Sequence, residues 1–299
     1  MTDRDEFDWT ALSRRISRSV QTTIGWIFWD PGAVARYEKR GLQSGLGYIA
    51  ARSAPFASAG PEALSAALGS ISPLGIAVLY QLLEEPSSWM DFWHLRNEAV
   101  REGLVAYAPE IVEHLIAFGP ELWEVVHQLP LAGRPFVASH LALPIPDDPL
   151  LSSWHAVNFI REWRGDTHWA IVASHNLSGN EASILHNAWL GYEGDWLSLS
   201  RGNSPEDIER AWSSLETRGL ATSHLVNELG LQLRQSIEDE TDRICALPWQ
   251  LLGAEKSKQF IEEFEPPCEK LLQRVDETAG TNYQPASRLQ GNEKPQPPK

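Results

Sequence analysis

Histidine side chains are unusually close together in one part of the sequence. His155, His168, His175 and His186 lie within a stretch of 32 residues. His168 and His175 are seven positions apart, about 10 Å along a helix, which is too far for them to share one metal ion. The sequence has no HExxH motif and no His-Cys cluster. We therefore predict no metal site and no cofactor, and keep a single histidine as an axial haem ligand as the one open alternative.

Two arginines accompany these histidines. The segment REWRGDTHW places Arg161, Arg164, Asp166 and His168 within eight residues. In one interpretation, Asp166 caps a helix and Arg164 pairs with it on the surface. In the other, arginine and histidine line a pocket and bind an anionic group of an otherwise aromatic ligand.

Tryptophan is the outlier of the composition, with 13 residues in 299. Such rings can simply fill a core, or they can line a pocket for a flat apolar ligand. Trp154, Trp163, Trp169 and Trp189 are close to the histidines in sequence, and a surface would not expose so many rings. We predict a largely apolar cavity, reached by His155 or His168, for a ligand with one acidic or carbonyl end. The predicted ligand-binding residues are Trp154, His155, Arg164, His168, Trp169 and Trp189.

The charge balance limits the possible partners. The chain has 25 basic and 40 acidic residues, a formal net charge of −15. Nucleic acids and anionic membranes carry phosphates that a partner must neutralise, so both are disfavoured. No apolar run approaches the length of a membrane span, and the first residues are acidic rather than basic as in a secretory signal. With only two cysteines, Cys245 and Cys268, we expect a cytoplasmic protein.

Helical spacing of apolar residues dominates the chain and predicts an all-α fold with minor β structure. Prolines between 129 and 151 predict a linker. The expected organisation is an N-terminal helical domain (1–128), a Pro-rich linker (129–151), a second helical domain (152–265) and a largely disordered tail (266–299).

Within the second domain, several elements can be placed by pattern. We expect separate helices over 153–163 and 167–176, a short strand over Trp196–Ser200 and one long helix over 227–252. In that long helix Glu240 falls on the apolar seam, so a buried carboxylate is expected there, paired with Arg243 or with a basic residue from the first half of the chain.

The two halves of the chain share a pattern. GAVARYEKRGLQSGLGYIAARS precedes GPEALSAALGSI in the first half, and HWAIVASHNLSGNEASILHNA precedes SPEDIERAWSSL in the second. Each pair is a helix, a short turn, a helix, a loop and a helix that starts at Pro-Glu. This pattern suggests an internal duplication, with the ligand cavity between two pseudo-repeated halves of a monomer. We favour the monomer over a homodimer because the first half can cover the surface that a partner would otherwise cover.

The segment SPEDIERAWSSLETRGLAT (204–222), followed by NELGLQLRQSIEDETDR, resembles winged helix-turn-helix regulators of the MarR type. Residues 9–252 as a whole resemble a bacterial helix-turn-helix-like family of poorly defined function. That resemblance rests on WHAVNFIREWRGDTHWA (154–170), LETRGL (215–220), TDRICALPWQLLG (241–253) and the pattern from Trp29 to Ser53. It implies a helical fold of winged-helix ancestry, but no particular reaction.

The sequence departs from a DNA-binding module of this type. The segment that corresponds to the recognition helix is acidic, and about six residues between Leu220 and Asn227 leave little room for a wing. Residues 150–265 contain 9 basic and 18 acidic side chains. We therefore expect a small-molecule binding protein, a sensor or an accessory protein of a pathway, and consider DNA binding unlikely. The alternatives are a MarR-like transcription regulator and an enzyme, cofactor-free or haem-binding, that uses a pocket histidine.

Overall fold

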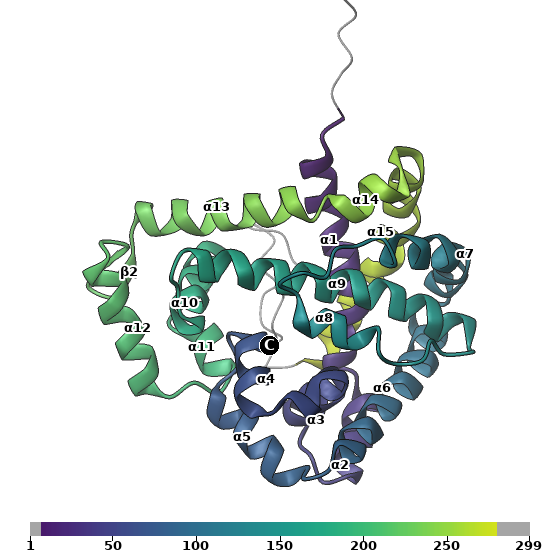
Figure 1. Ribbon diagram of the computed structural model, residues 1–299, viewed down its shortest axis with the longest axis horizontal. Coiled ribbons are helices and arrows are strands. Elements are labelled where there is room, and N and C mark those ends of the chain that lie inside the picture. The colour runs from purple at the N-terminus through teal and green to yellow at the C-terminus, as the bar shows by residue number, and fades with distance from the viewer. Residues whose placement is uncertain (1–6, 280–299) are drawn as a thin grey trace, which may run out of the picture.

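Helices make up most of residues 7–279, the part of the chain that the computed structural model describes (Figure 1). A two-stranded antiparallel sheet is the one sheet in this part, so the predicted all-α class with minor β structure is confirmed. The first helices are α1 (Trp9–Gly25), α2 (Pro31–Lys39), α3 (Ser44–Ser53), α4 (Pro61–Leu68), α5 (Pro73–Leu82), α6 (Pro86–Tyr107), α7 (Pro109–Val126) and α8 (Pro135–His140). They are followed by α9 (Pro149–Ser174), α10 (Gly179–Leu190), α11 (Trp196–Ser200), α12 (Pro205–Thr217), α13 (Glu228–Ile244), α14 (Leu247–Leu252) and α15 (Ala254–Thr278). Short 3₁₀ turns, η1 (Trp26–Phe28) and η2 (Ala54–Ala59), follow α1 and α3.

Many of these helices start where the sequence predicts, because capping residues and prolines fix their first turns. The Asp30 side chain accepts a hydrogen bond from the amide of Ala33, and Pro31 occupies the first helical position of α2. Ser204 caps α12 in the same way, with Pro205 next to it. No helix in the described part of the chain is long and apolar enough to cross a membrane.

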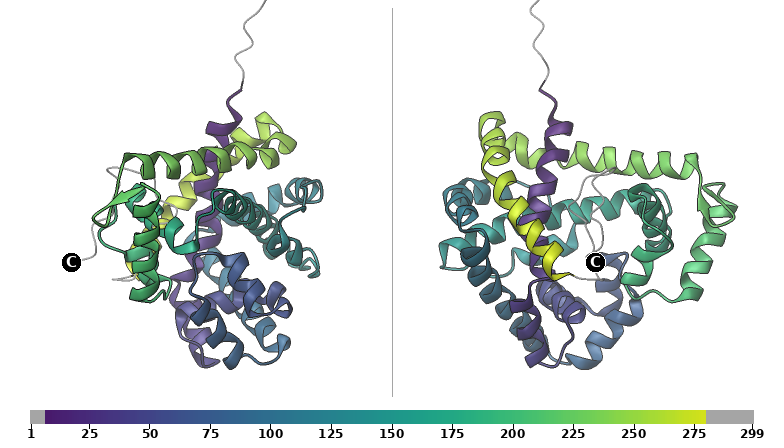
Figure 2. Two further views of the ribbon diagram at one scale, coloured as in Figure 1. Left: turned by 60° about the vertical axis from the view of Figure 1, so that its left-hand side comes forward. Right: turned by 180° about the vertical axis from the view of Figure 1, so that it is seen from behind.

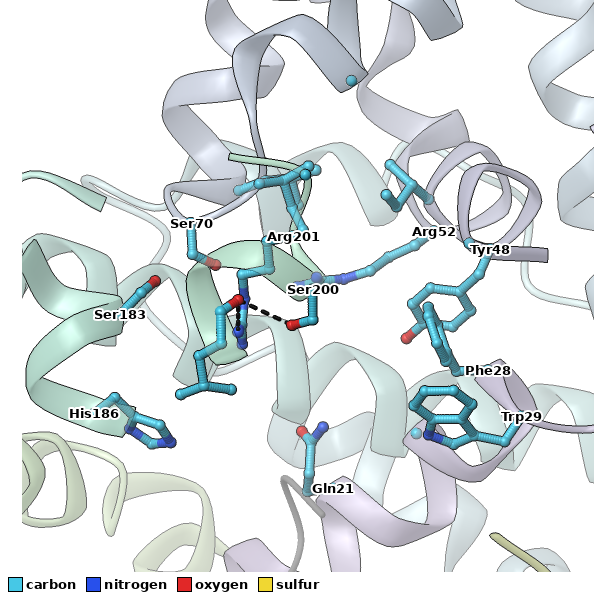
Figure 3. A pocket seen from close by; sticks show the side chains of 18 of the residues that line it. Gln21, Phe28, Trp29, Tyr48, Arg52, Ser70, Ser183, His186, Ser200 and Arg201 are labelled. Carbon is cyan, nitrogen blue, oxygen red and sulfur yellow. Dashed lines mark hydrogen bonds between the residues drawn. The ribbon is translucent and has the colours of Figure 1, made fainter. Parts of the chain in front are cut away.

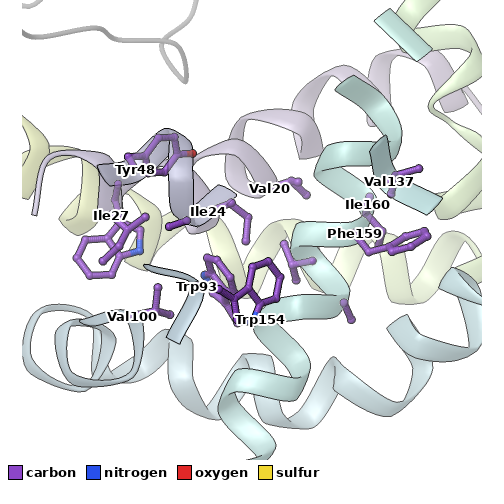
Figure 4. Close-up of a cluster of buried hydrophobic side chains, with 14 of the residues drawn as sticks. Val20, Ile24, Ile27, Tyr48, Trp93, Val100, Val137, Trp154, Phe159 and Ile160 are labelled. Carbon is purple, nitrogen blue, oxygen red and sulfur yellow. The ribbon is translucent and has the colours of Figure 1, made fainter. Parts of the chain in front are cut away.

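The helices form two bodies with separate apolar cores. The main body consists of α1–α8, the first half of α9, α14 and α15, and its core contains Trp154, Phe159 and Ile160 from α9 (Figure 4). The small unit consists of the end of α9, α10, α12, the β-hairpin and α13, and its core contains Leu185, Trp212 and Leu215. Helices α9 and α13 run side by side and connect the two bodies (Figure 1). Seen from behind, α15 returns along α1, far from it in sequence (Figure 2).

The two bodies meet in close backbone contact at two glycines, Gly69 and Gly179. A Cβ at Gly179 would lie only 1.9 Å from the Gly69 carbonyl oxygen, so no larger residue fits at the start of α10. Gly69 itself has φ of 59° and meets the Trp169 ring, with 2.5 Å between a built Cβ and that ring. Backbone contact therefore holds α10 against the loop after α4.

The expected linker and the expected pair of helices beside it need correction. Residues 135–140 form α8, whose Phe136 and Val137 are buried, and α9 already starts at Pro149. The helices expected over 153–163 and 167–176 are one continuous helix, α9. A single glycine, Gly165, weakens a helix by only about 1 kcal/mol, and burial along α9 outweighs that cost.

Three further expectations about elements were wrong. Trp196–Ser200 is the short helix α11 rather than a strand. The helix expected over 227–252 is divided into α13 and α14, because Pro248 has no amide to donate to the preceding turn. Residues 266–278, expected to belong to a disordered tail, continue α15 across Pro266 and Pro267, since Cys268, Leu271 and Leu272 are buried there. Residues 280–299 of the expected tail lie outside the described residues.

The buried carboxylate of α13 is Asp242, two residues after the predicted Glu240. The Asp242 side chain is fully buried and is bound by Arg14 (2.7 Å) and Arg164 (2.8 Å). Glu240 is on the surface and pairs there with Arg243 at 2.7 Å. Of the apolar seam of α13, Ile237 is buried as the pattern predicts, whereas Leu229 is exposed.

A short β-hairpin follows α12. Strands β1 (Ala221–Thr222) and β2 (Leu225–Val226) pair antiparallel, and Ser223 and His224 form the turn with positive φ angles of 51° and 56°. The order α2, α3, η2, α4 in the first half parallels the order α9, α10, α11, α12 in the second. The internal duplication itself stays a prediction.

Candidate functional site

A cavity of about 570 Å³ lies where the main body meets the small unit. Its wall combines residues of α1, η1, α3 and α15 with residues of α9, α10 and α11 (Figure 3). Its volume is within the range of small-molecule sites, about 300–1,000 Å³. Two surfaces that are far apart in the sequence therefore enclose one space.

One end of the cavity is aromatic. Phe28 stands edge-on to Trp29 and to Tyr48, with ring centroids 4.5 Å and 4.8 Å apart (Figure 3). Trp26 and Trp169 also line the cavity. Aromatic rings in these orientations leave faces and edges on which a flat apolar group can stack.

Three arginines also line the cavity. The cavity wall contains Arg52, Arg161 and Arg201 and, among the described residues, no aspartate or glutamate. Behind the wall, the fully buried Glu162 accepts from Arg52 Nε (2.8 Å), Arg52 Nη2 (2.7 Å) and Arg161 Nη1 (2.5 Å). Burial would raise the pKa of Glu162, but Arg161 and Arg52 hold it far below its usual value. One carboxylate is therefore shared by two of the three arginines.

Arg201 is held differently. It is the first residue after α11, and its Nη1 donates to the Leu197 carbonyl oxygen at 3.1 Å, beside Ser200 (Figure 3). Burial lowers the pKa of Arg201 to about 10, with a smaller contribution from Arg52. The guanidinium stays charged at neutral pH, and an anion at this place would repay its desolvation.

Two of the six predicted ligand-binding residues lie on the cavity wall. His168 and Trp169, from α9, both line it, and so does His186 from α10. Burial lowers the pKa of His168 to about 4, so the ring is neutral near pH 7. Ligand contact by His168 and Trp169 stays a prediction.

The other four predicted residues lie away from this cavity. Trp154 is fully buried in the main core and donates to the Thr23 carbonyl oxygen at 2.9 Å. His155 stacks on Trp93 with 4.8 Å between ring centroids, beside a separate cavity of about 20 Å³. Both side chains therefore pack α9 against the main body. They lie about four turns before His168 on α9 and do not share its contact with the cavity.

Arg164 and Trp189 are engaged on the α13 side. Arg164 binds two carboxylates, Glu238 at 2.5 Å and Asp242 at 2.8 Å, instead of a ligand anion or the predicted Asp166. Asp166 accepts instead from the amide of Val137 at 3.0 Å. Trp189 donates to Gln235 Oε1 at 2.9 Å. Arg164 and Trp189 are close to His168 in the sequence, but sequence spacing does not show which neighbouring helix each side chain faces.

The residues that sequence reasoning missed are Arg52, Arg201 and the aromatic group Phe28, Trp29 and Tyr48. The aromatic group and Arg52 are more than 100 residues before His168 in the sequence, and Arg201 follows a different helix, α11. No local sequence pattern therefore connects them with His168. Among the described residues, no group of three His, Cys, Asp or Glu side chains is arranged to hold a metal ion. The arrangement is suited to binding an organic anion with an aromatic body.

Comparison with known proteins gives a family and no individual relative. A family model described as a helix-turn-helix family matches residues 13–277, which includes both bodies and the cavity between them. No curated protein and no solved structure is significantly similar to the chain.

Proposed function

The chain belongs to this helix-turn-helix family, and we propose that it binds a small aromatic molecule with an anionic end in the cavity between its two bodies. The role is that of a sensor or of an accessory protein in a pathway. The observation that carries the proposal is the charge of the wall. In a chain with 40 acidic and 25 basic residues, the described cavity wall has three arginines and no carboxylate.

The shape of the cavity supports the same ligand. The aromatic rings of Phe28, Trp29 and Tyr48 lie on one side and Arg201 on the other, so an aromatic acid can satisfy both ends at once (Figure 3). Arg201 is the anion partner in this proposal, because it borders the cavity and an anion there would stabilise the charged form that burial disfavours.

The first experiment compares two ligands of one shape. We expect 2-naphthoic acid to quench tryptophan fluorescence and raise the melting temperature, and the neutral 2-naphthamide to bind more weakly. Substitution Arg201→Met is expected to remove about 1.5–3 kcal/mol of binding free energy for the acid, a loss of about 10- to 150-fold in affinity, and little for the amide. The matched control is Arg210→Met, which removes an exposed arginine of α12. Equal affinity for acid and amide, or an unchanged acid affinity in Arg201→Met, would contradict the proposal.

The family membership favours a second candidate, a DNA-binding regulator. In that reading α12 is the recognition helix and the hairpin is the wing, as in the winged-helix plan. The charged side chains of α12 and of Arg218, the residue after it, argue against this role. Arg210 pairs with Asp207, and Arg218 binds Glu181 and the His175 carbonyl oxygen. Both arginines are therefore engaged within the protein, and the helix is otherwise acidic.

We accordingly expect no salt-sensitive binding to duplex DNA. The measurement is fluorescence anisotropy with mixed-sequence duplexes at about 50 and 200 mM salt, where phosphate contacts weaken steeply. A variant that neutralises the helix, Glu206→Gln with Glu209→Gln, serves as a comparison, because it removes repulsion without adding a contact. Submicromolar binding by the unmodified chain that falls as salt rises would favour the regulator instead.

A further inference from the structure

His186 lines the cavity, and Arg234 fixes its tautomer. Its Nδ1 faces the guanidinium of Arg234, with 3.0 Å to Nε and 2.6 Å to Nη2. Arginine has no acceptor, so Nδ1 must carry the lone pair and Nε2 the proton. Arg234 is held in turn by Glu238 at 2.7 Å and lies over the Trp189 ring. The tautomer of His186 is therefore set by a chain of contacts on the side away from the cavity.

His168 is fixed in the opposite sense. Its Nδ1 lies 3.2 Å from the hydroxyl oxygen of Thr241. The single hydroxyl proton of Thr241 is already donated to the Ile237 carbonyl oxygen at 2.7 Å. The hydroxyl can then only accept, so the proton of His168 is on Nδ1 and its Nε2 is an acceptor.

Both rings are neutral and belong to one wall. Burial and then Arg234 lower the pKa of each histidine, to about 4 for His168 and well below its ordinary value for His186. Their partners Arg234 and Thr241 are seven residues apart on α13, which corresponds to two turns or about 10 Å. Through these two partners, α13 fixes a donor histidine of α10 and an acceptor histidine of α9 at separate points of the cavity wall. His186 also lies on the Arg201 side of the cavity (Figure 3).

We propose that this pair selects hydroxylated aromatic acids: His186 Nε2–H binds the anionic end together with Arg201, and His168 Nε2 accepts from a hydroxyl group on the ring. The inference rests on the proposed function and narrows its ligand class. A methyl ether cannot donate, and it would leave the His168 acceptor desolvated without a partner. Selectivity for the free hydroxyl follows from the tautomer of His168.

The first test needs no ligand. Long-range ¹H–¹⁵N correlation spectra of the ¹⁵N-histidine-labelled protein at pH 7 report which ring nitrogen carries the proton. We expect Nδ1–H for His168 and Nε2–H for His186, assigned with His168→Gln and His186→Gln. The near-isosteric Thr241→Val should move the His168 proton toward Nε2 and leave His186 unchanged. The opposite tautomers in the unmodified protein would overturn the inference, whatever the protein binds.

The second test uses 2-naphthoic acid, its 3-hydroxy and 6-hydroxy derivatives and their methyl ethers. We expect at least one hydroxy acid to bind about tenfold more tightly than both the parent acid and its own methyl ether. Thr241→Val should remove this preference and leave the affinity for the parent acid unchanged. Binding of the parent acid without any hydroxyl preference would overturn the histidine pair alone. Failure of every acid to bind, with the expected tautomers present, would overturn the proposed function and with it the ligand class.

Discussion

Acidification from pH 7 to pH 5 is expected to lower the free energy of unfolding by several kcal/mol. The reason is a set of histidines that the fold keeps neutral. His140 donates from Nδ1 to the Phe136 carbonyl oxygen, and its Nε2 is buried with no hydrogen-bond partner among the described residues. His155 Nε2 is likewise buried without a hydrogen-bond partner among the described residues, next to the buried Arg96. Burial lowers the pKa of His140 to about 4 and that of His155 well below its ordinary value.

The sign follows from proton uptake. Between about pH 6.5 and pH 4 an unfolded chain protonates these histidines and the folded chain does not, so stability falls as the pH falls through this window. At pH 5 each buried histidine shifted in this way costs about 2 kcal/mol. His168 and His186, whose pKa values are lowered by burial in the same direction, add to this loss. Asp166, whose pKa burial raises to about 6, acts in the opposite direction and offsets about 1 kcal/mol.

Urea denaturation at half-unit steps from pH 7 to pH 5 measures this dependence. We expect His155→Phe, which keeps a ring against Trp93, to reduce the slope by about one proton, or about 1.4 kcal/mol per pH unit. His94→Gln changes an exposed histidine of α6 and should leave the slope as it is. A flat stability profile between pH 5 and pH 7 would show that the buried histidines are hydrated or protonated in the folded chain.

The sequence predicted the fold class and most helix starts, because both depend on local signals. Pro31 and Pro205 with their capping residues mark α2 and α12 without any tertiary information. Errors arose where tertiary burial overrides a local signal. Pro266 and Pro267 read as the beginning of a tail, yet the buried Phe264 and Cys268 keep the helix together through them.

The sequence predicted the candidate site only in part, for the same reason. The density of Trp and His indicated that α9 faces a cavity, and His168 and Trp169 do line it. The partners that give the cavity its charge could not be paired by spacing, since Arg52 and Glu162 are 110 residues apart. Arg164 was predicted to bind a ligand anion because nothing near it in the sequence showed that Glu238 and Asp242 supply two carboxylates.

The pair of Arg52 and Glu162 leads to the second large effect, which is on both stability and binding. Glu162→Gln keeps the shape of the side chain but replaces one accepting oxygen by an NH₂ group. That group must face a donor of Arg52 or Arg161, because both carboxylate oxygens accept hydrogen bonds from these arginines. Removing one partner of a buried ion pair costs about 3–5 kcal/mol, so we expect a correspondingly lower urea midpoint for the variant.

A surface pair with the same geometry provides the control. Arg15 and Glu265 also form two parallel hydrogen bonds, each 2.7 Å long, but the Arg15 side chain is 61% exposed and that of Glu265 29% exposed. Glu265→Gln should cost less than about 1 kcal/mol, since water and salt screen the pair. Equal losses in the two variants would mean that the Glu162 carboxylate is hydrated and that its two arginines do not depend on it.

The same substitution changes the cavity. Without the carboxylate, Arg52 and Arg161 keep their charges at the cavity wall and lose the group that neutralises them. An aromatic acid in the cavity can then provide the missing negative charge, so we expect Glu162→Gln to bind 2-naphthoic acid more tightly and 2-naphthamide with unchanged affinity. The acid should also raise the melting temperature more in this variant than in the unmodified protein, because a ligand that binds only the folded state stabilises it more the more tightly it binds. Weaker acid binding by Glu162→Gln, measured under conditions where the variant is folded, would place the anion away from Arg52 and Arg161.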